Sequence, residues 1–318
     1  SLLHRVTPAL MEPGVMELSL AVGIMAGDEI MVAEMLRRGI DINEKCDDLG
    51  ETPLMHACTE KQEAIALKLI EMSADVNTKD IFGKTALIQC CELELWAVAQ
   101  ALIEHGADVN AVDTSCDWAG MTTTLTAACK KGHVATVRSL VEHRADVNST
   151  NQRGVTALMC ACSEGHEATA RALLELGADI NAAKKNGATV MMCASSGGLE
   201  SVVRALVESG LDVNAADEDG RTALMMACSA GHEAVARALI ELGADINAAD
   251  RQGWTALMVV CKKEDEATAR ALLALGADVN AACKRDGWTA LIYACFERNE
   301  AVPRMLMQHG ASVITRRS

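Results

Sequence analysis

The sequence predicts an all-α solenoid, a row of stacked helix–turn–helix repeats, on three observations. The segment DEDGRTALMMACSAGHEAVARALIELGADINAA, which begins at Asp217, recurs along the 318-residue chain with small changes. The residue that closes each copy returns after 33 or 34 residues, apart from one interval of 38. Apolar residues in each copy recur at helical spacing, and helices this short are marginal in water unless neighbours cover them. A fixed period of about 33 residues is typical of a solenoid. The closing residues are Asn43, Asn77, Asn110, Asn148, Asn181, Asn214, Asn247 and Asn280, with Ile314 at the same place in the last copy.

Each repeat is predicted to begin with a short helix. Thr222 stands directly before an apolar run, where its hydroxyl can accept a backbone N–H and cap the helix. Leu224, Ala227 and Cys228 then fall at i, i+3 and i+4 and form one buried face of a helix of about nine residues. Gly231 ends this helix. The capping position recurs at Thr85, Thr156, Thr189, Thr255 and Thr289, and the terminating Gly at Gly132 and Gly165.

A second helix follows in each repeat. Val235, Leu239 and Ile240 are expected to point inward, and Gly243 stops the helix before an extended turn, ADINAADRQG. The polar face of this helix carries Glu at i and Arg at i+4, a pairing typical of a solvated side. The pairs are Glu167/Arg171, Glu200/Arg204, Glu233/Arg237, Glu266/Arg270 and Glu300/Arg304.

The composition excludes several classes of protein. Half of the residues are apolar, which excludes global disorder. The formal net charge is −15, whereas binding to nucleic acid or an anionic membrane needs a basic face. No run of about 18 apolar residues could span a bilayer. The 13 Cys are too sparse for a secreted disulfide framework, and residues 1–16 lack the apolar core of a signal peptide. We therefore expect a cytoplasmic protein, with the nucleus or an organelle interior as alternatives.

The repeated pattern D-x-x-G-x-T-A-L-M-x-A-C-x-x-G-H…L-L-x-x-G-A-D-V-N resembles the ankyrin repeat, whose common form reads T-P-L-H-x-A-A-x-x-G-H. The resemblance implies helix–loop–helix repeats with projecting β-hairpin fingers, and a concave surface of fingers and first helices that binds other proteins. Only Pro53 keeps the proline after the capping Thr. The family His becomes Met in five repeats, which removes the hydrogen bonds that His makes in the family. These are Met55, Met159, Met192, Met225 and Met258.

The resemblance divides the chain into a tail, nine repeats and a second tail. Residues 1–16 form the N-terminal tail, residues 17–314 the repeat domain and residues 315–318 the C-terminal tail. The first repeat lacks both the capping Thr and a finger, as an N-terminal cap should. The interval of 38 places about five extra residues in the finger between Asp113 and Thr123. The repeats are 17–46, 47–79, 80–112, 113–150, 151–183, 184–216, 217–249, 250–283 and 284–314.

Recurrent Cys and His residues raise the question of a metal site or an enzyme. Equivalent cysteines of neighbouring repeats cannot form disulfides, because stacked helices lie about 8–10 Å apart, and a thiol suits their small buried site. His133, His166 and His232 begin second helices without a recurring nucleophile or carboxylate, and no nucleotide-binding motif occurs. We therefore expect no enzyme activity, no cofactor and no metal. The cysteines at equivalent positions are Cys58, Cys91, Cys129, Cys162, Cys228, Cys261 and Cys295.

Scarce aromatic residues indicate a candidate binding site. Only 2% of the residues are aromatic, yet Trp254, Trp288, Tyr293 and Phe296 all lie in the last two repeats. Residues 250–318 carry a net charge of +2, against −17 for residues 1–249. Aromatic side chains ringed by Arg and Lys are typical of binding hot spots. The alternative is that each Trp simply packs one finger on the next. The surrounding basic residues are Arg251, Lys262, Lys263, Lys284 and Arg285.

Three weaker features have ordinary alternatives. Phe82 and Trp118 form a possible second cluster on the third finger and the insertion, whereas Trp96 is expected to serve packing. Asn110 and Asn247 resemble sites that are hydroxylated in the family, but bonding of the finger backbone is sufficient to explain them.

These observations favour a non-enzymatic scaffold that binds another protein or peptide, of acidic or mixed charge, through its groove and finger tips. The C-terminal repeats are the expected site, and the free protein is expected to be a monomer. One alternative is a permanent structural subunit of a larger assembly. Another is a targeting or ubiquitin-ligase adaptor, which would need a further recruiting motif.

Overall fold

The computed structural model describes residues 20–114, 121–296 and 300–312. Contacts divide the chain into two units, Ser1–Gln152 and Arg153–Ser318. In unit 1, residues 20–25 are helical. They precede α2 (Glu29–Arg37), α3 (Pro53–Thr59), α4 (Glu63–Glu71), α5 (Ala86–Leu93), α6 (Trp96–Glu104), β1 (Val112–Asp113), β2 (Thr122–Thr123), α7 (Thr124–Lys130) and α8 (Val134–Glu142).

Unit 2 repeats the same pairing of helices. Its elements are α9 (Ala157–Ser163), α10 (Glu167–Glu175), α11 (Val190–Ser196), α12 (Glu200–Glu208), α13 (Ala223–Ala230), α14 (Glu233–Glu241), α15 (Ala256–Lys262), α16 (Glu266–Ala274), α17 (Ala290–Phe296) and α18 (Ala301–Gln308).

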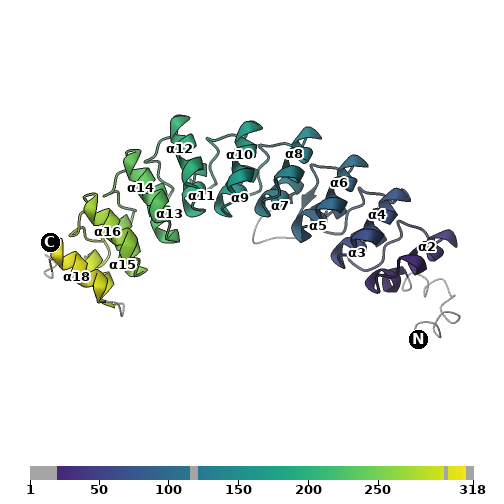
Figure 1. The fold of residues 1–318 in the computed structure, drawn as a ribbon, viewed down its shortest axis with the longest axis horizontal. Coiled ribbons are helices and arrows are strands. Elements are labelled where there is room, and N and C mark those ends of the chain that lie inside the picture. Colours follow the sequence, from purple (N-terminus) through teal and green to yellow (C-terminus); the bar gives the residue numbers. More distant parts are fainter. Residues whose placement is uncertain (1–19, 115–120, 297–299, 313–318) are drawn as a thin grey trace. The chain divides into compact units, whose positions relative to one another are not determined.

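Within each unit the helices form two layers (Figure 1). The odd-numbered helices from α3 onward are the first helices of their repeats, and the even-numbered helices are the second. Each first helix packs on the second helix that follows it and on the first helix of the next repeat in its unit. The all-α stacked fold predicted from the sequence is confirmed.

Threonine caps begin most first helices. The hydroxyl of Thr156 accepts the backbone N–H of Met159 at 3.2 Å, three residues on, which satisfies one of the free donors at a helix start. Thr289 was predicted to do the same, and this prediction is wrong: its hydroxyl is buried and has no hydrogen-bond partner. The same cap, at 3.1–3.5 Å, is made by Thr52, Thr85, Thr123, Thr189, Thr222 and Thr255.

Buried leucines recur along the second helices of both units. Each second helix from α4 to α18 contributes one Leu that is at most 1% exposed. Burying one such side chain contributes about 1.5–3 kcal/mol, so these leucines are a large part of what holds each second helix in its unit. They are Leu69, Leu102, Leu140, Leu173, Leu206, Leu239, Leu272 and Leu306.

The fingers connect each second helix to the next first helix, and strand pairing in them is short. β1 and β2 pair antiparallel at the base of the finger that carries the insertion. Other fingers have a single antiparallel bridge, for example Ala249 with Thr255. The tips are closed instead by a side chain: Asp250 Oδ1 accepts the backbone N–H groups of Gln252 and Trp254, both at 2.8 Å.

Backbone hydrogen bonds join successive fingers. Arg251 N donates to Asp219 O at 2.8 Å, and Lys284 N donates to Gln252 O at 2.7 Å. The close approach explains Gly253, which has a φ of +85°, because a Cβ there would lie 2.8 Å from Lys284 N. Within unit 2, these bonds hold successive fingers to one another.

The third repeat has Glu94 and Leu95 where several repeats have the Gly–His turn between their two helices. Glu94 ends α5 with a φ of 67°, a left-handed conformation that glycine adopts in other repeats. Lys61 and Glu264 also have positive φ, at 56° and 58°. The fold therefore tolerates a side chain at this turn.

Candidate functional site

The four aromatic residues of the last two repeats lie in contact in unit 2. Trp254 and Trp288 end two successive fingers, and Tyr293 and Phe296 lie on α17. The ring of Tyr293 has its centre 4.4 Å from Trp254 and 5.3 Å from Trp288, both tilted. Trp288 stacks on Phe296 at 4.8 Å with 11° between the planes. We call these four residues the aromatic cluster.

The repeat register brings these rings together. Trp254 and Trp288 each stand directly before the Thr that precedes the first helix, so they occupy equivalent places in neighbouring repeats. Tyr293 and Phe296 are three residues apart on α17 and therefore share a helix face. Trp254, Trp288 and Tyr293 are half-buried, whereas Phe296 is 68% exposed. The cluster therefore combines mutual packing with an accessible edge.

The last finger differs from the others beneath the cluster. It contains one more residue than the preceding finger, and Cys283 replaces the tip aspartate at the position of Asp250. The Cys283 thiol donates to Asp286 Oδ1, which also accepts Trp288 N at 3.1 Å. Sγ of Cys283 lies 3.6 Å from the Tyr293 hydroxyl oxygen. This network fixes the positions of two of the four rings.

The Tyr293 phenol remains neutral at physiological pH. Burial, followed by its contact with Cys283, raises the pKa of Tyr293 well above its ordinary value of 10. The cluster thus carries no charge of its own, and its charge environment comes from the lysines and arginines beside it.

Of the basic residues predicted around the cluster, Lys262 contacts it directly. Lys262 Nζ lies 5.1 Å from the centre of the Trp254 ring, a cation–π contact. Lys263 Nζ instead donates to Ser229 O in the preceding repeat. Arg251, Lys284 and Arg285 are exposed, and no ion pair joins them to an acidic residue within the part of the chain that the structure describes.

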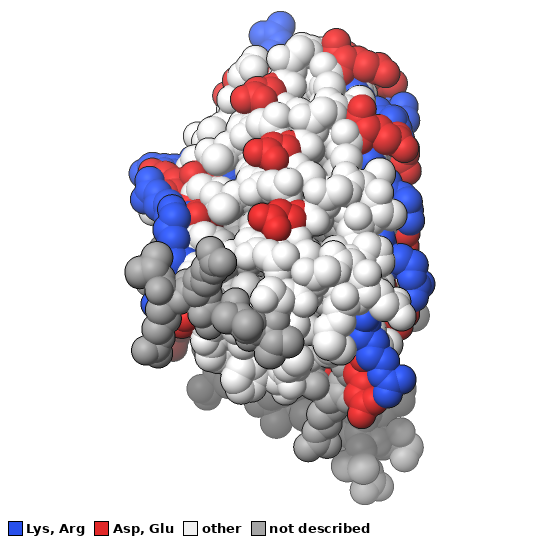
Figure 2. All heavy atoms as spheres, turned by 90° about the vertical axis from the view of Figure 1, so that its left-hand side faces the viewer, with Lys and Arg blue, Asp and Glu red and all other residues white. Residues whose placement is uncertain are grey.

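The arginines of the second helices are paired, in contrast. Each of the five predicted Glu/Arg pairs is present, for example Arg237 with Glu233 at 2.7 Å. Arg204 also reaches Glu241 of the next repeat at 2.8 Å. Figure 2 shows that charged side chains gather along two edges of the side viewed, with mostly uncharged surface between them and a row of acidic side chains within it. The other four pairs are Arg171–Glu167, Arg204–Glu200, Arg270–Glu266 and Arg304–Glu300.

Comparison with known families decides the relationship. The family model described as ankyrin repeats (3 copies) matches residues 18–113, 114–184, 182–250 and 243–317. The chain is an ankyrin repeat protein. Ankyrin repeats are generally modules for protein–protein interaction and are generally non-enzymatic. The comparison with curated proteins finds no match.

Of the two residues of the second predicted cluster of this ankyrin protein, the structure describes only Phe82. Phe82 is 41% exposed on its finger, and its carbonyl accepts Thr114 N at 2.9 Å. Trp118 lies outside the described residues, so its relation to Phe82 stays a prediction. Trp96 stacks on His133 at 4.1 Å and 3°, between neighbouring repeats, as expected for a packing residue.

Six of the seven recurrent cysteines are buried as predicted, whereas the prediction is wrong for Cys295 in the last repeat, which is exposed because no further repeat covers α17. Burial raises the pKa of Cys91, Cys228 and Cys261 to about 12, so these thiols stay protonated. No group of three His, Cys, Asp or Glu residues within the described ranges could hold a metal ion. One contact joins cysteines at positions that are not equivalent and was not predicted from the repeat spacing: Cys90 Sγ lies 3.3 Å from Cys58 Sγ.

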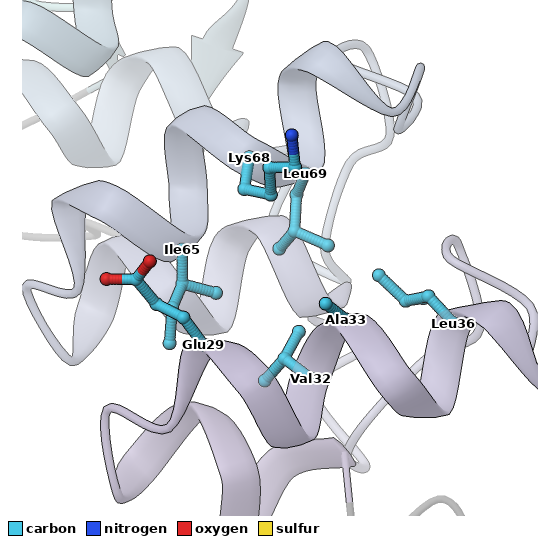
Figure 3. Close-up of a pocket in the computed structure, with 7 residues that line it drawn as sticks. All are labelled: Glu29, Val32, Ala33, Leu36, Ile65, Lys68 and Leu69. Carbon is cyan, nitrogen blue, oxygen red and sulfur yellow. The ribbon is translucent and has the colours of Figure 1, made fainter.

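Two hollows differ in what they could accept. The one between α2 and α4 measures about 10 Å³, room for a single water molecule (Figure 3). Its wall mixes the aliphatic Val32 and Ile65 with the charged Glu29 and Lys68. The other measures about 310 Å³, is almost entirely apolar and lies at α17 and α18. Leu291, Ile292, Cys295, Phe296 and Met307 line it, so Phe296 belongs both to this hollow and to the aromatic cluster.

No described helix meets the length and hydrophobicity that crossing a lipid bilayer requires.

Proposed function

We propose that this ankyrin repeat protein is a non-enzymatic scaffold that binds a partner protein or peptide at its last two repeats. The contiguous aromatic cluster is the single observation that carries this proposal. Trp and Tyr are enriched in binding hot spots, because they bury a large area and have few rotatable bonds. Here Tyr293 and Trp288 are already fixed by each other and by the last finger. Their ordering therefore costs little upon binding.

The partner is proposed to be acidic, or mixed in charge with acidic side chains facing this site. Lys262 lies over Trp254, and Arg251, Lys284 and Arg285 are exposed beside the cluster. An acidic segment would bring opposite charge to these groups, whereas a basic segment would be repelled. The proposed partner segment places an apolar or aromatic side chain on Phe296 and carboxylates near the arginines. We propose that the free protein is a monomer in the cytoplasm.

A second candidate is a permanent structural subunit, favoured by the apolar hollow at α17 and α18. Phe296 and Met307 at its edge are 68% and 50% exposed, which a permanent neighbour would cover. Gel filtration of the native protein separates the two functions. A scaffold is recovered in part as the free monomer, and a permanent subunit is found only in the larger assembly.

Cross-linking mass spectrometry in native extract tests the proposed site. Lys262, Lys263 and Lys284 lie in the last two repeats and provide amines for the cross-linker, and the exposed Lys185 provides a comparison site in the same unit. Trp254→Ala/Trp288→Ala should reduce partner cross-links at the three lysines by roughly tenfold or more. The matched control, Glu233→Ala/Arg237→Ala, removes an ion pair on a second helix and should leave them unchanged. An equal loss of partner cross-links in the tryptophan variant and in the control variant would reject the site. So would wild-type protein that cross-links to the partner as strongly at Lys185 as at the three lysines.

A further inference from the structure

Two cysteines of the second and third repeats lie against each other inside unit 1. Cys58 is near the end of α3, and Cys90 lies on α5, the first helix of the next repeat. Their Sγ atoms are 3.3 Å apart, and both residues are 0% exposed. This distance exceeds an S–S bond of about 2.05 Å by little more than an ångström.

The contact depends on a residue that is unusual in this chain. Cys90 stands directly before Cys91, which holds the recurrent cysteine position of its repeat. At the position of Cys90 most other repeats have alanine, and one has valine at Val260. A thiol at this position faces the recurrent cysteine of the preceding repeat. The alanines are Ala57, Ala128, Ala161, Ala194, Ala227 and Ala294.

We propose that Cys58 and Cys90 are an oxidation site that forms a disulfide between the second and third repeats. The oxidant is a small peroxide such as hydrogen peroxide, which can enter a buried site where a bulky disulfide reagent cannot. One sulfur attacks a peroxide oxygen, which forms a sulfenic acid and releases water. The second sulfur then displaces the sulfenic oxygen as water, and the S–S bond forms. In total two thiols and one H2O2 give one disulfide and two waters.

The surroundings determine how readily this happens. Hydrogen bonding to Cys58, with burial, raises the pKa of Cys90 well above its ordinary value of 9, so little thiolate is present at neutral pH. The reaction therefore proceeds through brief local openings of α3 and α5, and it is slow. Its product is selective nonetheless, because the two sulfurs are already in contact when the helices close.

A disulfide here would cross-link the second and third repeats. In a stacked array each repeat is stabilised mainly by its nearest neighbours, so the link should slow opening of α3 to α6. Oxidation would thus stiffen the N-terminal unit, whereas the aromatic cluster lies in the other unit. Oxidation at this site therefore does not depend on the proposed binding function.

Peptide mapping of the full-length protein under non-reducing conditions tests the proposal. After treatment with hydrogen peroxide, a peptide linking Cys58 to Cys90 should appear with a mass loss of about 2 Da and disappear upon reduction. Cys90→Ala should abolish it, and the alanines of the equivalent repeats indicate that this variant folds, which circular dichroism checks. Cys91→Ala removes the adjacent thiol and should leave the link unchanged.

Three results would overturn the proposal. One is a protein whose exposed Cys295 becomes oxidised while Cys58 and Cys90 both remain thiols. Another is a link from Cys58 to Cys91 in place of Cys90. The third is a Cys58–Cys90 link that forms only in denaturant.

Hydrogen exchange adds an independent readout, because protection of α3 to α6 should rise by roughly tenfold or more in the oxidised wild type and not in oxidised Cys90→Ala.

Discussion

Asparagine side chains set the spacing between neighbouring repeats. Asn77 Oδ1 accepts Asp108 N at 2.7 Å, and its Nδ2 donates to Gly106 O at 3.1 Å, so one side chain holds the finger base of the next repeat. Asn214 makes the same two bonds to Asp245 and Gly243. An amide supplies both a donor and an acceptor, which explains why the closing residue is nearly always Asn. This structural role accounts for Asn110 and Asn247 without any modification.

At the same scale, His56 and Glu51 form a half-buried ion pair that should make stability depend on pH. His56 Nδ1 lies 3.7 Å from Glu51 Oε2, and Gln89 donates to the other carboxylate oxygen at 2.8 Å. Glu51 raises the pKa of His56 above its ordinary 6.5 and is helped by the charges of Glu60 and Asp47. His56 in turn lowers the pKa of Glu51 below its ordinary 4.5, helped by Gln89 and Lys84.

The sign of the effect follows from these two directions. The raised His56 pKa gives stability that is complete below about pH 6.5 and is lost as the pH rises through the folded pKa. The lowered Glu51 pKa gives stability that is present above about pH 4.5 and is lost as the pH falls. His56→Gln should therefore cost up to about 1 kcal/mol at pH 5.5 and clearly less at pH 8.5. Urea unfolding of both proteins at the two pH values measures this, and an equal cost at both would contradict it.

At the scale of the element, the start of each first helix is the most regular feature of the chain. The Thr cap satisfies a backbone donor and fixes where the finger ends, so it also places the residue before it. Trp254 precedes Thr255, whose hydroxyl accepts Met258 N at 3.4 Å. Trp288 precedes Thr289, whose hydroxyl has no partner. The last first helix therefore begins without the bond that fixes the others.

This difference predicts that Thr→Ala lowers the free energy of unfolding by different amounts at the two positions. Thr156→Ala should destabilise its repeat by about 1 kcal/mol, because the 3.2 Å bond to Met159 N is lost. Thr289→Ala should cost much less, because it removes a buried hydroxyl that has no partner to lose. Both residues are at most 6% exposed, so the loss of the methyl group is comparable. Hydrogen exchange of α9 and α17 measures the loss of local stability in each variant. Equal losses of stability would show that the hydrogen bond of the Thr hydroxyl is unimportant.

The elements were predictable from the sequence, whereas several contacts in the site were not. Thr156, Gly231 and the Glu/Arg pairs act through neighbours within one helix turn, so spacing alone locates them. The aromatic cluster was predictable as a group, because both Trp residues share one register. Spacing could not show that Tyr293 packs between the two Trp rings or that Lys263 bonds Ser229, because rotamers decide these contacts. The Cys58–Cys90 contact joins positions offset by one residue, which comparison of equivalent positions overlooks.

At the scale of the whole molecule, charge and apolar surface are unevenly distributed. The chain has a net charge of −15, yet residues 250–318 carry +2. In unit 1 the finger residues Leu49, Ile81 and Phe82 are 45%, 62% and 41% exposed. In unit 2 the corresponding described tips carry charged residues such as Glu218 and Arg251. The two ends of the chain therefore offer different chemistry to a partner.

Because repeats pack mainly on their nearest neighbours, the loss of stability from a core substitution should be confined to nearby repeats. Leu239 on α14 is 0% exposed, and α14 packs on α12, α13 and α16. Leu239→Ala should cost about 2–5 kcal/mol locally and raise hydrogen exchange from α11 to α16. Exchange in α3 and α4 should be unchanged, because each repeat is stabilised by its immediate neighbours. Leu275→Ala, at a side chain that is 42% exposed, is the matched control and should change little. Faster exchange in every repeat of Leu239→Ala would show instead that the chain unfolds as one cooperative body.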